Sequence, residues 1–181
     1  MPLSQPQNRQ RIHQREITCR GYRRDDGLWD IEGHLLDTKT YAFSNQFRGE
    51  VRPGEAVHEM WLRLTIDEAR HVHAAEAATD HAPYAICPDI TPNFNALAGL
   101  RIGPGWMSEV RKRVGGVLGC THLVELLGPM ATTAYQTLAG QRKKHESAGE
   151  KKRPFFLDTC HAHASDSEVV KMHWPEYYTG D

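Results

Sequence analysis

The chain has 181 residues, 39% hydrophobic and 25% charged, which is enough for one compact domain with a buried core. Its 22 basic and 23 acidic residues nearly cancel, so no overall charge would attract nucleic acid or an anionic membrane surface. The four cysteines do not form a disulfide framework, and no stretch approaches the roughly 18 apolar residues of a membrane helix. Because a secretory signal is also missing, we expect a cytoplasmic protein with reduced thiols, no membrane partner and no nucleic-acid partner.

Alternation of apolar and polar residues predicts an antiparallel sheet in the first half of the chain. Two strands, from Ile12 to Arg23 and from Leu28 to Tyr41, flank the sequence Arg24-Asp25-Asp26-Gly27, whose Asp-Gly pair favours a hairpin. After a loop, apolar and polar residues alternate again from Met60 to Ile66, and a fourth strand is predicted from His71 to Ala78.

Helical signals dominate the second half of the chain. The sequence Asp89-Ile90-Thr91-Pro92 is typical of a helix start and leads into a helix over Asn93 to Leu100. A second helix is predicted from Pro104 to Arg113, and a third, with an apolar stripe at helical spacing, from Thr121 to about Leu138. Pro129 lies inside the third helix and should kink it or split it in two.

These elements predict an α+β fold in which an antiparallel sheet of N-terminal strands packs against a C-terminal set of helices. We expect a single α+β domain over residues 1–140 and a charged linker over 141–153, which contains four lysines. Residues 154–181 begin with the apolar sequence Pro154-Phe155-Phe156-Leu157 and are expected to pack back on the domain.

Cys120, His122 and Glu125 lie together at the predicted start of the third helix. Free backbone N–H groups and the helix dipole favour a thiolate there, and His122 and Glu125 share a helix face. A thiolate and a neutral imidazole suit zinc or ferrous iron, whereas a carboxylate next to a histidine can orient it or move a proton. The alternative is a small buried cysteine beside a helix-capping cluster.

Further polar groups lie where strands begin or end. His58 lies on the inward face of the third strand. It is expected to be a metal ligand, a base or a histidine packed in the core. Asp80 follows the fourth strand, where it either belongs to a functional site or forms a turn. Asp37 can likewise be a turn residue. In the tail, Cys160 and His161 would complete the first site if the tail folds back, or form a separate chelating segment.

Several motifs resemble a bacterial family called domain of unknown function 2889. They are Ile17 to Tyr22, Asp26 to Lys39, Gly119 to Leu123, Pro129 to Ala134 and Asp158 to Ala162, and the resemblance extends from Arg9 to Tyr178. Members of this family often occur in bacteria that degrade aromatic compounds. The resemblance therefore implies a small aromatic molecule as substrate or ligand.

The order of elements is also similar to that of the iron–sulfur scaffold proteins of the NifU and IscU group, in which a three-stranded antiparallel sheet precedes helices. This NifU/IscU-like resemblance implies ligand positions near His58, Asp80 and Cys120. Only one of these three is a cysteine, which disfavours an iron–sulfur cluster. A single divalent metal, zinc or iron, or a metal-free acid/base pocket is the expected use of such a scaffold.

Two functions follow as hypotheses. The first is a lyase of aromatic-compound catabolism, with a pocket between sheet and third helix and with the catalytic residues His58, Asp80, His122 and Glu125. The second is a non-enzymatic metal-binding or carrier protein with the ligands His58, Asp80, Cys120 and His122. A structural subunit, in which the polar cluster only caps helices, is the third alternative. Trp61 and Arg63 alternate with the core residues of their strand, which predicts a second layer or a subunit contact, as in a homodimer, on that face.

Overall fold

The computed structural model describes residues 3–145 and 153–181. The chain divides into two compact units, Met1–Gln141 and Arg142–Asp181. No helix within the described residues is long and apolar enough to cross a membrane.

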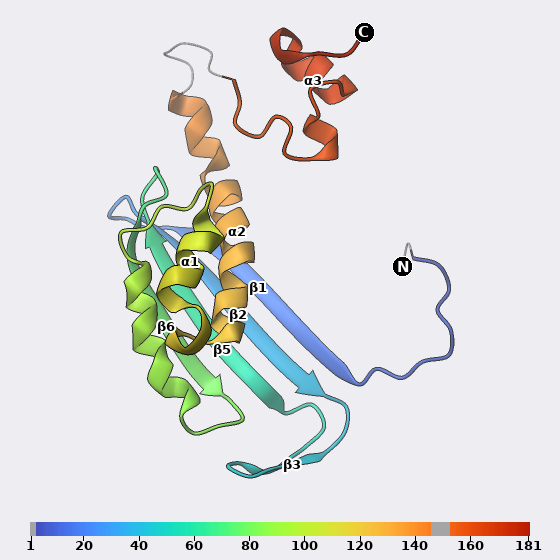
Figure 1. Ribbon diagram of the computed structural model, residues 1–181, viewed down its shortest axis with the longest axis vertical. Helices are drawn as coiled ribbons and strands as arrows, with labels where there is room; N and C mark the ends of the chain where they lie inside the picture. The colour runs from blue at the N-terminus through green and yellow to red at the C-terminus, as the bar shows by residue number, and fades with distance from the viewer. Residues whose placement is uncertain (1–2, 146–152) are drawn as a thin grey trace. The chain divides into compact units, whose positions relative to one another are not determined.

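The first unit is built on a four-stranded antiparallel sheet with the strand order β1-β2-β5-β6 (Figure 1). Its strands are β1 (His13–Arg23), β2 (Trp29–Lys39), β5 (Ala56–Ile66) and β6 (Val72–His81). The predicted antiparallel sheet is thereby confirmed, including the hairpin at Asp26-Gly27, where Gly27 adopts a φ of 84°. A small hairpin of β3 (Phe43–Asn45) and β4 (Gly49–Val51), which the sequence patterns did not reveal, lies between β2 and β5.

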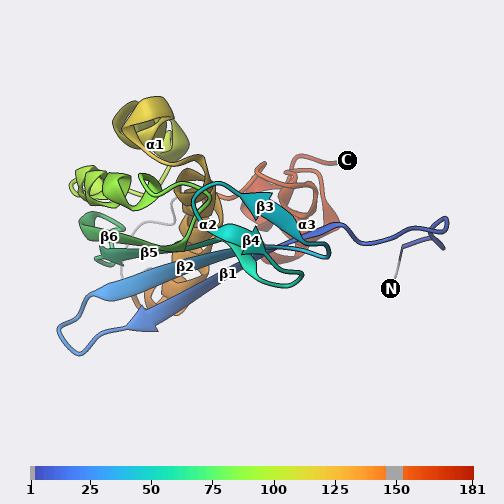
Figure 2. The ribbon, with the colours of Figure 1, turned by 90° about the horizontal axis from the view of Figure 1, so that it is seen from below.

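Helices cover one face of this sheet, as the view along the sheet shows (Figure 2). They are the 3-10 helices η1 (Cys87–Leu97) and η2 (Gly116–Leu118) and the α-helices α1 (Trp106–Val114) and α2 (Thr121–His145). The first helix is a 3-10 helix that contains Pro92 and ends at Leu97, three residues before the predicted end at Leu100. The helix α2 continues through Pro129 as one helix, so of the two predicted effects of this residue the split is wrong and the kink stays a prediction.

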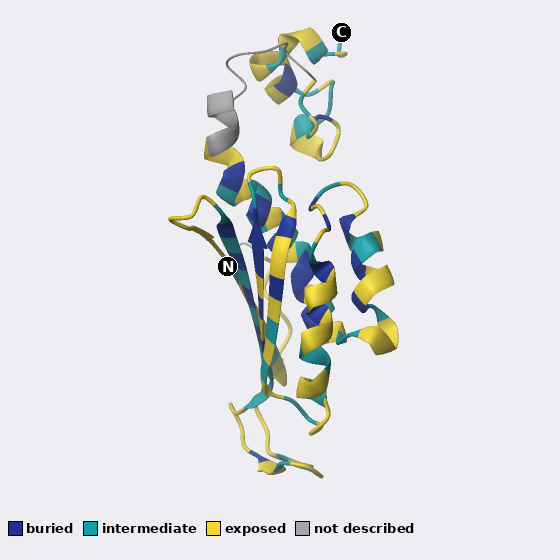
Figure 3. Cartoon of the chain, turned by 90° about the vertical axis from the view of Figure 1, so that its left-hand side faces the viewer, coloured by how far each residue is buried: buried dark blue, intermediate teal, exposed yellow. Residues whose placement is uncertain are grey.

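The core forms where the inward residues of the strands meet the helices (Figure 3). Among its fully buried side chains are Ile31, Leu35, Met60, Leu62, Leu64, Phe94, Leu123, Leu126 and Leu127. At Gly33 the helix α2 approaches β2 so closely that a Cβ atom would lie 2.7 Å from the sulfur of Met130. The absence of a side chain at this position therefore sets the distance between the sheet and the helix that carries His122.

The second unit is small and consists of short helices. They are η4 (His161–His163), α3 (Glu168–His173) and η5 (Pro175–Tyr177). The carboxylate of Asp158 accepts hydrogen bonds from the backbone N–H and hydroxyl of Ser165 and from Arg153. Since α2 reaches His145, the remainder of the expected linker, 146–152, lies outside the described residues. That this unit packs back on the first stays a prediction.

Candidate functional site

A row of three polar residues crosses one end of the sheet. The register pairs Arg15 of β1 with Asp37 of β2, and Asp37 with His58 of β5. Asp37 has the same parity as Ile31 and Leu35 along β2, so its side chain points toward the helices, and only 2% of the residue is exposed. The strand pairing itself therefore brings a guanidinium, a carboxylate and an imidazole together beneath α2.

Asp37 is the acceptor at the centre of this row. Arg15 donates from Nε to Oδ1 and from Nη2 to Oδ2, each at 2.7 Å. His13 Nε2 lies 3.1 Å from Oδ1, and His58 Nδ1 lies 3.0 Å from Oδ2. Burial alone would raise the pKa of Asp37, but the hydrogen bonds and charges of Arg15 and His58 outweigh it and lower that pKa below its usual value. Asp37 is accordingly a carboxylate at neutral pH.

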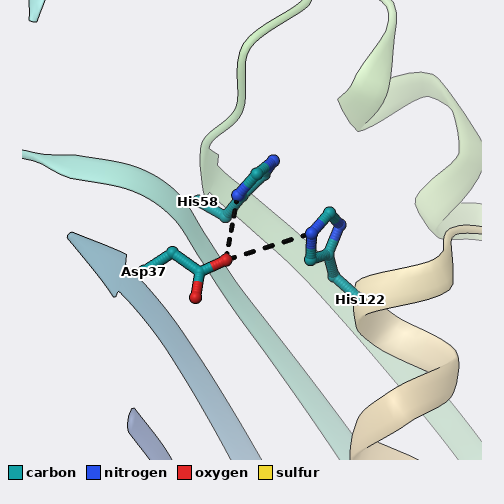
Figure 4. A group of neighbouring side chains, drawn as sticks. All are labelled: Asp37, His58 and His122. Carbon is teal, nitrogen blue, oxygen red and sulfur yellow. Dashed lines mark hydrogen bonds and ion pairs between the residues drawn. The ribbon is translucent and has the colours of Figure 1, made fainter. Parts of the chain in front are cut away.

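The helix α2 adds His122 from above the sheet. This residue lies in the first turn of α2, and its Nε2 is 3.9 Å from Oδ2 of Asp37 (Figure 4). The rings of His58 and His122 stack with their centroids 3.9 Å apart and an angle of 29° between their planes. Two imidazoles from distant parts of the sequence therefore share one buried carboxylate.

Both stacked histidines favour the neutral form. Burial lowers the pKa of His58, and the charge of His122 lowers it further, against the opposing effect of Asp37. Burial likewise lowers the pKa of His122, with a further decrease from the positive charge of Arg15. Because His58 donates its Nδ1 proton to Asp37, the neutral ring keeps an unprotonated Nε2. That nitrogen can accept a proton or bind a metal.

Glu125 and Cys120 lie at the margin of this cluster. Glu125 accepts a hydrogen bond from Nη1 of Arg15, so the guanidinium joins two carboxylates. The Cys120 sulfur lies 3.8 Å from Nδ1 of His122 and 3.8 Å from the sulfur of Met60. Glu125 therefore bonds Arg15 and also acts on His122 through its negative charge, which opposes the lowering of the pKa of His122, whereas the Cys120 sulfur lies next to Nδ1 of His122.

The structure places Asp80 elsewhere. Its carboxylate accepts a hydrogen bond of 2.9 Å from Nε1 of Trp61, a residue that alternates with the inward-facing Met60 and Leu62. Asp80 also lines a cavity of about 250 Å³ together with aromatic Phe47 and Tyr84. Of the residues expected at the site, His58 and His122 are thus brought together, Cys120 and Glu125 lie beside them, and Asp80 does not join them.

Asp37 and Arg15 are the members of the site that the sequence patterns did not place there, and the turn interpretation of Asp37 is wrong because this residue lies within β2. The available signal was the alternation of β2, whose inward positions are Trp29, Ile31, Gly33, Leu35 and then Asp37. An aspartate that continues an apolar face must find a partner. The register of the hairpin makes Arg15 that partner. This pairing can be predicted only if the length of the turn between β1 and β2 is known.

The cluster also offers ligand atoms for a metal ion. One oxygen of Asp37 and one nitrogen each of His58 and His122 lie within 4.8 Å of one another, the single such group among the described residues. Two imidazoles and a carboxylate suit zinc or ferrous iron. Neither Asp80 nor Cys120 belongs to the group, and the fork of Arg15 already occupies both oxygens of the carboxylate.

Fold and site together define an α+β protein with a polar cluster between a sheet and its covering helix. Residues 13–136 match the family described as "Protein of unknown function (DUF2889)", and the chain belongs to this family. The matched range begins with β1 and includes Arg15, Asp37, His58 and His122. No curated protein and no solved structure matches the chain, so the likeness to the NifU and IscU group stays a prediction.

Proposed function

We propose that this protein is a lyase that breaks a carbon–carbon bond in a small aromatic compound by acid/base catalysis. The observation that carries the proposal is the Asp37–His58 pair, in which a buried carboxylate holds the Nδ1 proton of a neutral imidazole. A histidine oriented in this way is a general base at neutral pH. His122, stacked on the same ring, is a second proton-transfer group.

The reaction would proceed on a substrate with a hydroxyl beside the bond to be broken. Nε2 of His58 takes the hydroxyl proton, the freed electron pair forms a carbonyl, and the adjacent carbon–carbon bond breaks. Its electron pair stays on the carbon attached to the aromatic ring, which stabilises the charge by conjugation. A proton from His58 or His122 is then added to this carbanion. The substrate is thereby divided into an aldehyde and a neutral aromatic product.

Arg15 and Asp37 position the base in this scheme. The positive charge that develops on His58 during proton transfer lies 3.0 Å from the Asp37 carboxylate and is stabilised by it. Arg15 fixes that carboxylate through two hydrogen bonds and adds a positive charge near the developing anion. The aromatic nature of the substrate rests on the family resemblance rather than on the geometry of the site.

The test is a panel of phenolic compounds with a hydroxyl beside a side-chain carbon–carbon bond, with aldehyde release as the assay. We expect His58→Gln and His122→Gln to lower kcat/KM, the former by about 100-fold or more. The matched control is His34→Gln, since His34 stacks on Trp61 and not on the His58–His122 pair. Full activity of the folded His58→Gln variant would refute the proposed base.

A metal-binding or carrier function is the second candidate, because Asp37, His58 and His122 offer one ligand atom each within 4.8 Å. A zinc or iron ion held there would supply a Lewis acid. Elemental analysis of untagged protein distinguishes the ligand sets. If this group binds the metal, His58→Gln and His122→Gln lose it, whereas Asp80→Asn and Cys120→Ser retain it. Metal-free wild-type protein after growth in zinc and iron would exclude this candidate.

A further inference from the structure

The strand β1 is a long free edge of the sheet. Within the described part of the chain β2 is its only neighbour, and nine of its eleven residues are exposed (Figure 2). The opposite edge differs at its start, because the backbone of Val72, the first residue of β6, exchanges hydrogen bonds with Gly99 and Leu100. An edge strand of this length leaves a row of backbone N–H and C=O groups ready to pair with another strand.

The sequence of β1 is complementary to itself in the antiparallel direction. If two copies pair with Thr18 opposite Thr18, Glu16 of each copy lies opposite Arg20 of the other, which makes two opposite-charge pairs. Among the side chains that the structure describes, those of residues 3–140 and 153–181, neither Glu16 nor Arg20 forms an ion pair. On the other face Ile17, which is 36% exposed, would lie opposite Cys19. Shifting the centre to Ile17 or Cys19 loses both charge pairs.

The open face of the sheet is a poorer interface than this edge. Trp61 stacks on His34 at 3.7 Å and donates its N–H to Asp80. Arg63 forms ion pairs with Glu32 and Glu76. The charges of Arg63 are therefore already paired within the chain, whereas on β1 Glu16 accepts a hydrogen bond only from the neutral amide of its neighbour Gln14 among the described side chains.

We propose that two copies of this chain associate through β1, paired antiparallel about Thr18, so that their two sheets become one continuous sheet. Directly opposite residues of an antiparallel pair lie on the same face, so both copies would carry their helices on the same side. The inference is independent of the proposed chemistry. It nevertheless concerns the same strand, since Arg15 lies on β1 one residue before Glu16.

Charge exchange tests both the interface and its register. The full chain is measured by sedimentation equilibrium as wild type, Glu16→Arg, Arg20→Glu and the double variant, with circular dichroism as the check on folding. Each single variant places like charges opposite each other twice, and we expect dimer affinity to fall about tenfold or more. The double variant restores both pairs and should regain wild-type affinity. Glu50→Arg, a reversal on β4, is the control and should leave the affinity unchanged.

Three results would overturn the proposal. A wild-type protein that remains monomeric at all concentrations has no such interface. A dimer that both single variants leave intact uses another surface. Loss of association in the single variants without recovery in the double variant would show that the strands do not pair about Thr18.

Discussion

Replacing Asp37 by asparagine removes one negative charge from the centre of the site while keeping the shape of the side chain. In the folded protein this carboxylate accepts two hydrogen bonds from Arg15, one from His13 and one from His58. An asparagine offers a single acceptor oxygen and turns an N–H₂ group toward these donors. Asp37→Asn therefore removes the buried counter-charge of the Arg15 guanidinium and leaves it paired with Glu125.

The loss of stability can be bounded from burial. Removing one partner of a fully buried ion pair costs about 3–5 kcal/mol. Here the side chain of Asp37 is 3% exposed but that of Arg15 is 30% exposed, so water compensates part of the loss. We expect Asp37→Asn to lower the free energy of unfolding by about 2–4 kcal/mol at pH 7.

The effect must also depend on pH with a definite sign. The folded-state pKa of Asp37 lies below that of the unfolded chain, so its contribution is complete above about pH 4 and is lost as the pH falls through the folded pKa. Urea unfolding of wild type and variant from pH 7 to pH 3 should therefore converge in acid. The control is Asp26→Asn, an exposed aspartate paired with Arg24, for which we expect a much smaller change. Equal stability of Asp37→Asn and wild type at pH 7, or a difference that persists unchanged in acid, would refute this account.

Two further predictions concern packing and titration. Gly33→Ala, whose new methyl group would press on buried Met130, should destabilise the protein by about 1–3 kcal/mol. Gly140→Ala, in open space on α2, should stabilise it by about 0.5–1 kcal/mol. Urea unfolding measures both changes, and a change of the same sign in both variants would contradict the close approach of α2 to Gly33. In metal-free protein, burial holds the pKa values of His58 and His122 below 6.5, so the free energy of unfolding should decrease as the pH falls below about 6.5. NMR titration checks the pKa values directly, and the pH dependence should weaken in His58→Gln.

The sequence predicted the sheet well because its strands alternate in polarity and its first hairpin has an Asp-Gly turn. It predicted helices in the right order, but not that the segment around Pro92 is a 3-10 helix, and it left open whether α2 is split at Pro129 or continues through it. For the site, periodicity identified the inward position of His58, and clustering drew attention to His122. The pairing of Arg15 with Asp37 joins residues 22 positions apart, and no local pattern contains that information.

The turn between β1 and β2 lies at the opposite end of the hairpin from the site, yet it determines which residues meet there. Arg15 faces Asp37 because every pair from Arg23 and Trp29 onward follows the register that this turn sets. Inserting or deleting one residue between Arg24 and Leu28 would slip β1 by one position and turn the guanidinium to the other face of the sheet. The buried carboxylate would then face a side chain from an adjacent position of β1, Gln14 or Glu16. A loop without a single chemical group in the site thus controls the charge balance within it.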